Sequence, residues 1–205
     1  MTRPSEPTRE GGLQEFIISE MRRTAQVIDA ASRDPALVGV IEAVAGRCVA
    51  ALRAGGKILL AGNGGSAADA QHLAAEFVSR FAYDRPGLSA LALTTDTSAL
   101  TAIGNDYGYE KLFQRQIQAM GRAGDVFFGI STSGRSPNVL AALGEARSLG
   151  IVTVGLTGQN EGGMEPLCDY TIHVPSTETP KIQEGHITIG HIICGLVEQA
   201  MFPRP

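Results

Sequence analysis

The hydrophobic positions of the chain follow two different periods. Between Leu13 and Ala31 apolar residues recur with helical spacing, and a second helical pattern runs from about Pro35 to Ala54. Beyond Ala54, short and nearly unbroken apolar runs alternate with further helical patterns. These runs predict five strands: Lys57–Ala61, Ser89–Leu93, Asp125–Ile130, Ile151–Gly155 and Tyr170–Val174.

The repeated order of strand, polar turn and helix predicts the fold class. Strands that are apolar along their whole length suit a parallel sheet covered on both faces. The intervening patterns predict four helices: Ser66–Arg80, Tyr109–Gly121, Ser136–Leu149 and Pro180–Met201. We therefore predict an α/β protein, a three-layer α/β/α sandwich around a five-stranded parallel sheet, with the N-terminal helical pair added. Ligands of such sheets bind at the carboxyl ends of the strands.

Length and composition suit a soluble globular protein of one domain. We place a single domain over 13–205, with the helical pair over about 13–54, after a polar tail over 1–12 that we expect to be disordered. A net charge of −4 and the lack of a basic stripe argue against a nucleic-acid partner. The cysteines Cys48, Cys168 and Cys194 have no CxxC spacing, which predicts free thiols. No stretch looks long enough to span a bilayer, so we expect a cytoplasmic protein without a membrane partner.

The turn after the first predicted strand, "GNGGS" at Gly62–Ser66, opens directly into a helix. Its glycines let backbone N–H groups approach a ligand, and the helix N-terminus adds partial positive charge. The spacing also resembles a dinucleotide fingerprint. That signal is weak, because the acidic residue expected after the next strand is represented only by Asp96, which comes late.

The turn after the third predicted strand, "STSGRS" at Ser131–Ser136, gathers three serines and a threonine at another helix start. Hydroxyl groups and backbone amides together satisfy the oxygens of a phosphate monoester without a metal. The alternative is ordinary N-capping by serine. Since capping needs one hydroxyl rather than four, we favour phosphate binding. The turn lacks the GxSxG pattern of a serine hydrolase.

Two helices carry candidate metal ligands. His72 and Glu76 stand one helical turn apart, and Gln183 and His191 flank one stripe of the last helix. Four N and O donors could enclose a cation such as zinc. Ordinary helix contacts and a hydrogen-bonded core histidine explain the same spacing, and spacing alone favours them over a metal site. His186 is a competing candidate ligand, but the five-residue step from His186 to His191 turns the two side chains well apart around the helix. His173 belongs to a predicted strand.

Glycines recur along the last predicted helix, at Gly185, Gly190 and Gly195. Each costs about 1 kcal/mol of helix stability relative to alanine. Close approach of another helix or of a second subunit would offset that cost. We therefore predict that this helix forms an interface.

Four segments together resemble the phosphoheptose isomerase family of the sugar isomerase (SIS) superfamily. They are "AGNGGSAADAQHLAAEF", "GNDYGYEKLF", "GDVFFGISTSGRSPNVL" and "IQEGHITIGHII", and they occur in the family's order. The resemblance runs from the N-terminal helices to the C-terminus. It implies a flavodoxin-like sheet and a homotetramer whose active sites are shared between subunits.

The resemblance also implies roles for individual residues. One Zn²⁺ per subunit is implied, with the ligands His72, Glu76, Gln183 and His191. The phosphate-binding residues implied are Ser131, Thr132, Ser133 and Ser136. Residues implied to contact the rest of the substrate are Asn63, Gly64, Gly65, Ser66, Glu76, Arg80, Asn105, Asp106 and Gln183. Arg135, Pro180 and Gly185 depart from residues common in the family.

The reaction implied is the interconversion of sedoheptulose 7-phosphate and D-glycero-D-manno-heptose 7-phosphate through an enediol. Glu76 would act as the base and His191 as the partner acid or base. A bound cation would polarise the carbonyl group.

Two rival functions remain open from the sequence. One is a non-catalytic tetramer from a branch of the same superfamily that binds the bacterial replication initiator. The segments "LTTDTSALTAIGND" and "LVEQAMFP" faintly resemble that branch. The other is an isomerase of another, shorter sugar phosphate. The presence of His72, Glu76 and His191 favours an enzyme, because a pure scaffold has no physical need for them.

Overall fold

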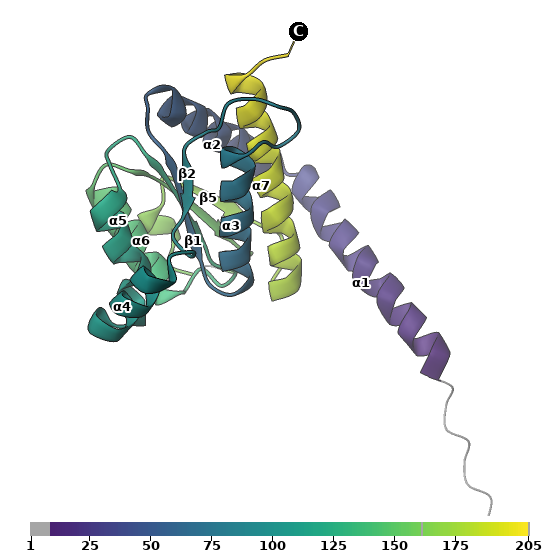
Figure 1. Cartoon of the computed structure of the whole chain (residues 1–205). Coiled ribbons are helices and arrows are strands. Elements are labelled where there is room, and N and C mark those ends of the chain that lie inside the picture. The colour runs from purple at the N-terminus through teal and green to yellow at the C-terminus, as the bar shows by residue number, and fades with distance from the viewer. Residues whose placement is uncertain (1–8, 161, 205) are drawn as a thin grey trace, which may run out of the picture.

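The protein is a three-layer α/β/α sandwich with one long helix projecting from it (Figure 1). The computed structural model describes residues 9–160 and 162–204. Its strands are β1 (Ile58–Gly62), β2 (Ala90–Ala92), β3 (Val126–Ile130), β4 (Val152–Thr157) and β5 (Tyr170–His173). Its helices are α1 (Arg9–Ser32), α2 (Pro35–Arg53), α3 (Gly65–Val78), α4 (Thr97–Tyr107), α5 (Leu112–Met120), α6 (Pro137–Ser148) and α7 (Thr179–Met201), with short 3₁₀ helices η1 (Tyr109–Lys111) and η2 (Glu165–Leu167).

All five strands are parallel and lie in the order β2-β1-β3-β4-β5. This is the flavodoxin-like order, in which the chain reverses direction of winding between β1 and β3. The turns that follow β1 and β3 therefore open side by side at the carboxyl edge of the sheet. The predicted strands and the predicted fold class are confirmed, with shifts of one or two residues at the ends.

Alternate side chains of the strands supply two cores. Ile58, Leu60 and Val126 belong to the core beneath α2, α3 and α7, whereas Leu59 and Phe127 belong to the core beneath α5 and α6. The burial of both strand faces explains why the strand sequences are apolar without interruption.

Helix α4 was not predicted from the sequence. None of its residues, all of which the structure describes, is fully buried, and Leu100 and Ile103 pack partly buried against the core. Asp96 caps its N-terminus, because its carboxylate accepts a hydrogen bond from the N–H of Ala99 at 2.9 Å. Asp96 is therefore a capping residue rather than the ribose-binding acid of a dinucleotide fold.

The N-terminal boundary differs from the prediction. We expected a disordered tail over 1–12, but α1 begins at Arg9; residues 1–8 lie outside the described part of the chain. The first half of α1 projects away from the body (Figure 1). Its second half is held to α7 by Lys181, whose ammonium group donates to Thr24 Oγ1 at 2.8 Å and pairs with Glu20 at 3.2 Å.

Helix α2 has its predicted extent but is more apolar than we expected. An 18-residue stretch of it has a mean hydropathy of 1.7, which by length and composition alone is enough to cross a bilayer, contrary to our expectation. Its buried side chains, among them Val44 and Cys48, pack in the core beneath the sheet. The apolar character of α2 is therefore explained at least in part by its place as a core helix.

The glycines of α7 serve packing within the chain. A Cβ atom on Gly190 would lie 2.6 Å from the Leu73 side chain of α3, and one on Gly185 would lie 2.6 Å from Val174. The close approach that we predicted thus joins α7 to its own neighbours. Gly190 gives no support to a subunit interface.

Candidate active site

An amide pair joins the turns that follow β1 and β3. Asn63 Nδ2 donates to Asn138 Oδ1 at 2.9 Å, and Asn138 Nδ2 donates back to Asn63 Oδ1 at 2.8 Å. The Tyr109 hydroxyl also donates to Asn63 Oδ1, at 2.9 Å. Asn138 is buried in the first turn of α6, so it fixes one turn against the other.

The serine turn is shaped by hydroxyl contacts and by one left-handed glycine. Ser131 Oγ and Ser136 Oγ lie 2.9 Å apart, and Gly134 has φ +63°. Ser136 occupies the N-cap position of α6, yet its side chain makes no capping hydrogen bond within the described part of the chain. N-capping therefore does not explain its hydroxyl. The arrangement fits the capture of an anion better than a simple helix start.

The first turns of α3 and α7 touch beside the glycine turn. A Cβ atom on Gly65 would lie 2.5 Å from Gln183 Nε2, so only glycine leaves room for this carboxamide. Gly62 has a similar role, since a Cβ atom there would lie 2.7 Å from the Ser66 Cβ. Gln183 thus reaches the carboxyl edge of the sheet, next to the Gly62–Ser66 turn.

A second group of side chains lies further along the same two helices. His72 Nε2 is 2.8 Å from His191 Nε2 and 3.3 Å from Glu76 Oε1. One donor atom from each of the three residues lies within 4.8 Å of the others. Two imidazole nitrogens and a carboxylate oxygen are donors that zinc accepts, so the donor set fits a divalent cation of that type.

The surroundings of this triad limit its chemistry. The Phe81 ring lies 5.6 Å from the His191 ring and covers part of it. Cys194 follows His191 by one helical turn, but burial, assisted by the charge of Glu76, raises the pKa of its thiol to about 12. Cys194 is therefore protonated at neutral pH and does not compete as a thiolate ligand or nucleophile.

Comparison with known proteins decides the family. A family model described as the SIS domain matches residues 18–158. Phosphoheptose isomerases from Burkholderia pseudomallei and Aneurinibacillus thermoaerophilus are each 60% identical to the chain, over 92% and 93% of it and 96% of each relative. The chain belongs to the phosphoheptose isomerase family of SIS-domain proteins. The structure of phosphoheptose isomerase GmhA from Neisseria gonorrhoeae superimposes with a TM-score of 0.85 at 42% identity, covering 91% of this chain and 99% of that one.

Membership of the phosphoheptose isomerase family makes the chain an isomerase and confirms its fold. It does not by itself assign the site residues, whose positions come from the geometry. The structure divides them between the two ends of α3. At the carboxyl edge of the sheet lie Asn63, Gly64, Gly65, Ser66, Ser131, Thr132, Ser133, Ser136 and Gln183.

The other end of α3 holds the triad of His72, Glu76 and His191. Glu76 follows Gly65 by eleven residues, which places it about 16 Å along the helix axis. His191 follows Gln183 by eight residues, about 12 Å along α7. Within one chain, therefore, the structure does not bring Gln183 or the serine turn to the triad.

Three further predicted residues lie in neither group. Arg80 is exposed just beyond the C-terminus of α3. Asn105 and Asp106 lie exposed on α4, where Asn105 Nδ2 donates to Asp106 Oδ1 at 2.8 Å. Their roles toward a substrate stay predictions.

The two remaining histidines are outside the site, as their sequence context indicated. His186 is fully buried, with Nε2 3.2 Å from the Thr157 carbonyl oxygen. His173 lies on β5, and its Nε2 is 2.7 Å from Glu165 Oε1. Neither side chain belongs to the triad.

Sequence analysis assigned no role to Asn138, Tyr109 or Phe81. Asn138 follows the serine turn by two residues, and a polar side chain in the first turn of an apolar helix was the available signal. Tyr109 and Phe81 carried no such signal, because their contacts to Asn63 and His191 join distant parts of the chain.

Proposed function

We propose that this isomerase interconverts sedoheptulose 7-phosphate and D-glycero-D-manno-heptose 7-phosphate through an enediol. The observation that carries the proposal is the meeting of a carboxylate, Glu76, with two imidazoles in a chain 60% identical to proteins named phosphoheptose isomerase. A base and an acid held together in this way are what proton transfer between adjacent carbons requires.

In the proposed mechanism, Glu76 removes a proton from C1 of the ketose. His191 supplies a proton to the oxygen on C2, which gives the enediol. Glu76 then returns a proton to C2, and His191 takes the proton from the oxygen on C1, which becomes the aldehyde. No proton is gained or lost overall, and both side chains end in their starting states.

A divalent cation, for which we propose zinc, would be held by His72, Glu76 and His191. The donor types support this assignment, and Gln183 is the fourth ligand that the family resemblance implies. A bound cation supplies Lewis-acid polarisation of the carbonyl group and stabilises charge on the enediolate.

We assign phosphate binding to the serine turn. Ser133 and Thr132 lie at its accessible rim, and the Ser131–Ser136 hydroxyl pair lies behind them. The N-terminus of α6 adds partial positive charge directed at a bound anion. Asn63, held by Asn138 and Tyr109, would contact the sugar chain.

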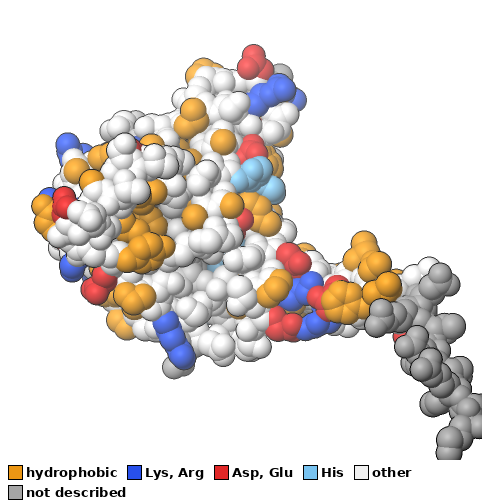
Figure 2. All heavy atoms as spheres, turned by 60° about the horizontal axis from the view of Figure 1, so that its bottom comes forward, with side chains coloured by type: hydrophobic (Ala, Val, Ile, Leu, Met, Phe, Trp, Pro, Cys, Tyr) orange, Lys and Arg blue, Asp and Glu red, His pale blue; other side chains and the backbone are white. Residues whose placement is uncertain are grey.

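We further propose a homotetramer in which one subunit completes the site of another. Two observations support shared sites: Glu76 lies about 16 Å along the axis of α3 from Gly65, where Gln183 meets the glycine turn, and α1 leaves apolar side chains exposed. Figure 2 shows these side chains along the projecting helix. The number of four subunits follows the family resemblance.

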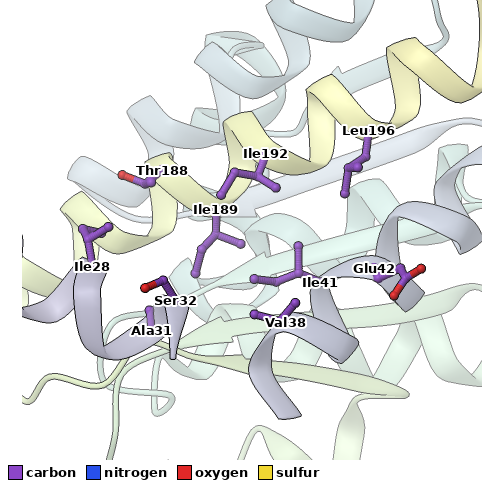
Figure 3. Close-up of a pocket in the computed structure, with 10 residues that line it drawn as sticks. All are labelled: Ile28, Ala31, Ser32, Val38, Ile41, Glu42, Thr188, Ile189, Ile192 and Leu196. Atoms are coloured by element: carbon purple, nitrogen blue, oxygen red, sulfur yellow. The ribbon is translucent and has the colours of Figure 1, made fainter. Parts of the chain in front are cut away.

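An apolar groove between α1, α2 and α7 offers a place for a second copy. It measures about 430 Å³ and is lined mainly by aliphatic side chains, including Ile28, Val38, Ile41 and Ile192 (Figure 3). Val38 and Ile192 are exposed in a single chain. Burial of such a groove by a subunit would remove apolar surface from water.

We place the enzyme in the cytoplasm. The three cysteines, all within the described residues, are free thiols, as a reducing compartment would keep them.

A substrate panel tests the proposal. Purified protein with added zinc is incubated with sedoheptulose 7-phosphate, with a pentulose 5-phosphate and with unphosphorylated sedoheptulose, and aldose formation is measured. We expect aldose only from the heptulose phosphate. Aldose from the pentulose phosphate instead would assign a shorter substrate, and no aldose from any of them would favour the non-catalytic scaffold.

A further inference from the structure

The segment between α3 and β2, residues 79–89, folds back across α7 (Figure 1), and we name it the return loop. Glu198 of α7 anchors it. Its carboxylate accepts hydrogen bonds from the N–H groups of Phe81 at 2.8 Å and Ala82 at 2.7 Å, and from Arg85 Nε at 3.0 Å. The loop is thus fastened to α7 at its first turn and at its middle.

Arg85 ties the same loop to the C-terminal end of α3. Its guanidinium donates to the carbonyl oxygens of Glu76 at 2.7 Å and Phe77 at 2.6 Å. It also donates to those of Ser79 at 3.2 Å and Pro86 at 3.1 Å. The last carbonyls of a helix lack partners within the helix, and a cation there also interacts favourably with the helix dipole.

The C-terminal residues hold the return loop from the other side. The Tyr83 hydroxyl donates to the Phe202 carbonyl oxygen at 2.8 Å, and the Arg204 guanidinium lies 3.7 Å from the centre of the Tyr83 ring. The loop is therefore fixed at several points rather than free to swing.

Both anchors act close to the triad. Arg85 binds the backbone carbonyl of Glu76 itself. Phe81, whose N–H is held by Glu198, places its ring 5.6 Å from the His191 ring, and a Cβ atom on Gly195 would lie 3.3 Å from that phenyl group. A shift of the return loop would therefore move the Phe81 ring, which packs beside the His191 ring.

We propose that Arg85 and Glu198 are positioning residues of the active site. They act through Phe81 and the end of α3 to hold the His191 ring and Glu76 in the geometry that proton transfer requires. The kinetic part of this proposal rests on the proposed function, whereas its structural part does not.

The charge state of the pair suits this role. Arg85 and Glu198 side chains are 2% and 1% exposed. Burial by itself would raise the pKa of Glu198, but the hydrogen bonds from Phe81, Ala82 and Arg85 outweigh it, so its pKa lies below the usual value. Glu198 is therefore a carboxylate at neutral pH, and its removal would leave Arg85 buried without its partner.

A matched pair elsewhere separates positioning from stability. Asp125, 1% exposed, accepts hydrogen bonds from the N–H groups of Lys57 at 2.9 Å and Arg122 at 2.8 Å and pairs with Lys57 Nζ at 2.6 Å. Like Glu198 it receives two backbone N–H groups and one cation, but its partners lie outside α3, α7 and the return loop. Asp125→Asn therefore weakens a similar set of contacts without disturbing Phe81, the end of α3 or the triad.

The test compares Glu198→Gln, Arg85→Lys, Phe81→Leu and the control Asp125→Asn with the wild type. Three measurements are made: the imidazole NMR shifts of the four histidines in metal-free protein, the affinity for Zn²⁺ alone, and kcat and KM with sedoheptulose 7-phosphate. We expect the three site variants to shift the His191 signals, to weaken Zn²⁺ binding and to lower kcat about tenfold or more with KM nearly unchanged. Asp125→Asn should leave all three measurements near wild type.

The proposal is overturned if Glu198→Gln and Arg85→Lys keep the wild-type His191 shifts and kcat, or if Asp125→Asn changes both to the same extent. Should Glu198→Gln fail to fold, Phe81→Leu and Arg85→Lys still decide, since both keep the carboxylate. A wild-type protein inactive on sedoheptulose 7-phosphate would refute the proposed function alone, because the NMR comparison needs no substrate.

Discussion

His186 and His191 lie five residues apart on α7 and have opposite surroundings. His191 faces His72 at the surface between α3 and α7. His186 is enclosed in the core, where its Nε2 donates to the Thr157 carbonyl oxygen and its Nδ1 has no partner among the described residues. The helix rotation that separates them was readable from the sequence, and it predicted that the two rings lie on different sides of α7.

The burial of His186 makes stability depend on pH. Burial lowers the pKa of this ring from 6.5 to about 4, with the Thr157 bond opposing the shift. Above pH 6.5 the ring is neutral in both states. As pH falls from 6.5 towards 4, the unfolded chain binds a proton that the folded protein does not, so the free energy of unfolding decreases, by on the order of 3 kcal/mol in all.

We predict that His186→Gln loses part of this acid sensitivity. Urea unfolding at pH 7 and pH 5 should show a drop in the free energy of unfolding that is about 2 kcal/mol smaller in the variant than in the wild type. Equal drops in both proteins would show that His186 does not titrate as its burial requires.

At the scale of elements, the apolar side chains of α1 have two different environments. In its second half, Val27 and Ala31 pack against the body of the protein. Further apolar side chains of α1 lie outside this contact, where Phe16 is 63% and Met21 70% exposed. A lone helix with such exposed side chains is unstable in water unless a further surface covers it.

We predict that Phe16→Ser combined with Met21→Ser shifts the assembly towards smaller species. Light scattering coupled to size-exclusion chromatography gives the mass. Arg22→Ser on α1 is the control and should keep the wild-type mass. An unchanged mass in the double variant would mean that α1 is not an assembly element.

The elements that the sequence predicted are those buried in the sheet and its covering helices. Both faces of the strands are buried, so their apolar runs are continuous, and α3 and α6 follow clear turns. Helix α4 escaped prediction because only Leu100 and Ile103 mark its contact with the core, and the rest of this described helix is polar, small or exposed. The α7 glycines were interpreted as an interface because sequence cannot say whether the neighbouring helix, here α3, belongs to the same chain.

At the scale of the whole molecule, the site has two halves. The half proposed for the chemistry, with Glu76 and His191, and the half proposed for phosphate binding, with the serine turn, were both candidates from the sequence. The sequence did not show that the two groups lie apart within one chain, because spacing along the chain predicts which residues share a helix face and not which subunit supplies the other half. A site shared between subunits reconciles both halves with one substrate.

Subunit mixing tests this central claim most directly. Glu76→Gln removes the base, and Ser131→Ala with Ser133→Ala removes hydroxyls that bind the phosphate, so each parent protein should lose most of its activity. The two chains are co-expressed with different tags, and the mixed assembly is purified through both.

In a mixed assembly, a site that takes Glu76 from one chain and the serine turn from the other has both intact in roughly a quarter of cases. We predict recovery of aldose formation from sedoheptulose 7-phosphate to about that fraction of the wild-type rate. A mixed assembly no more active than its parents would contradict the shared site.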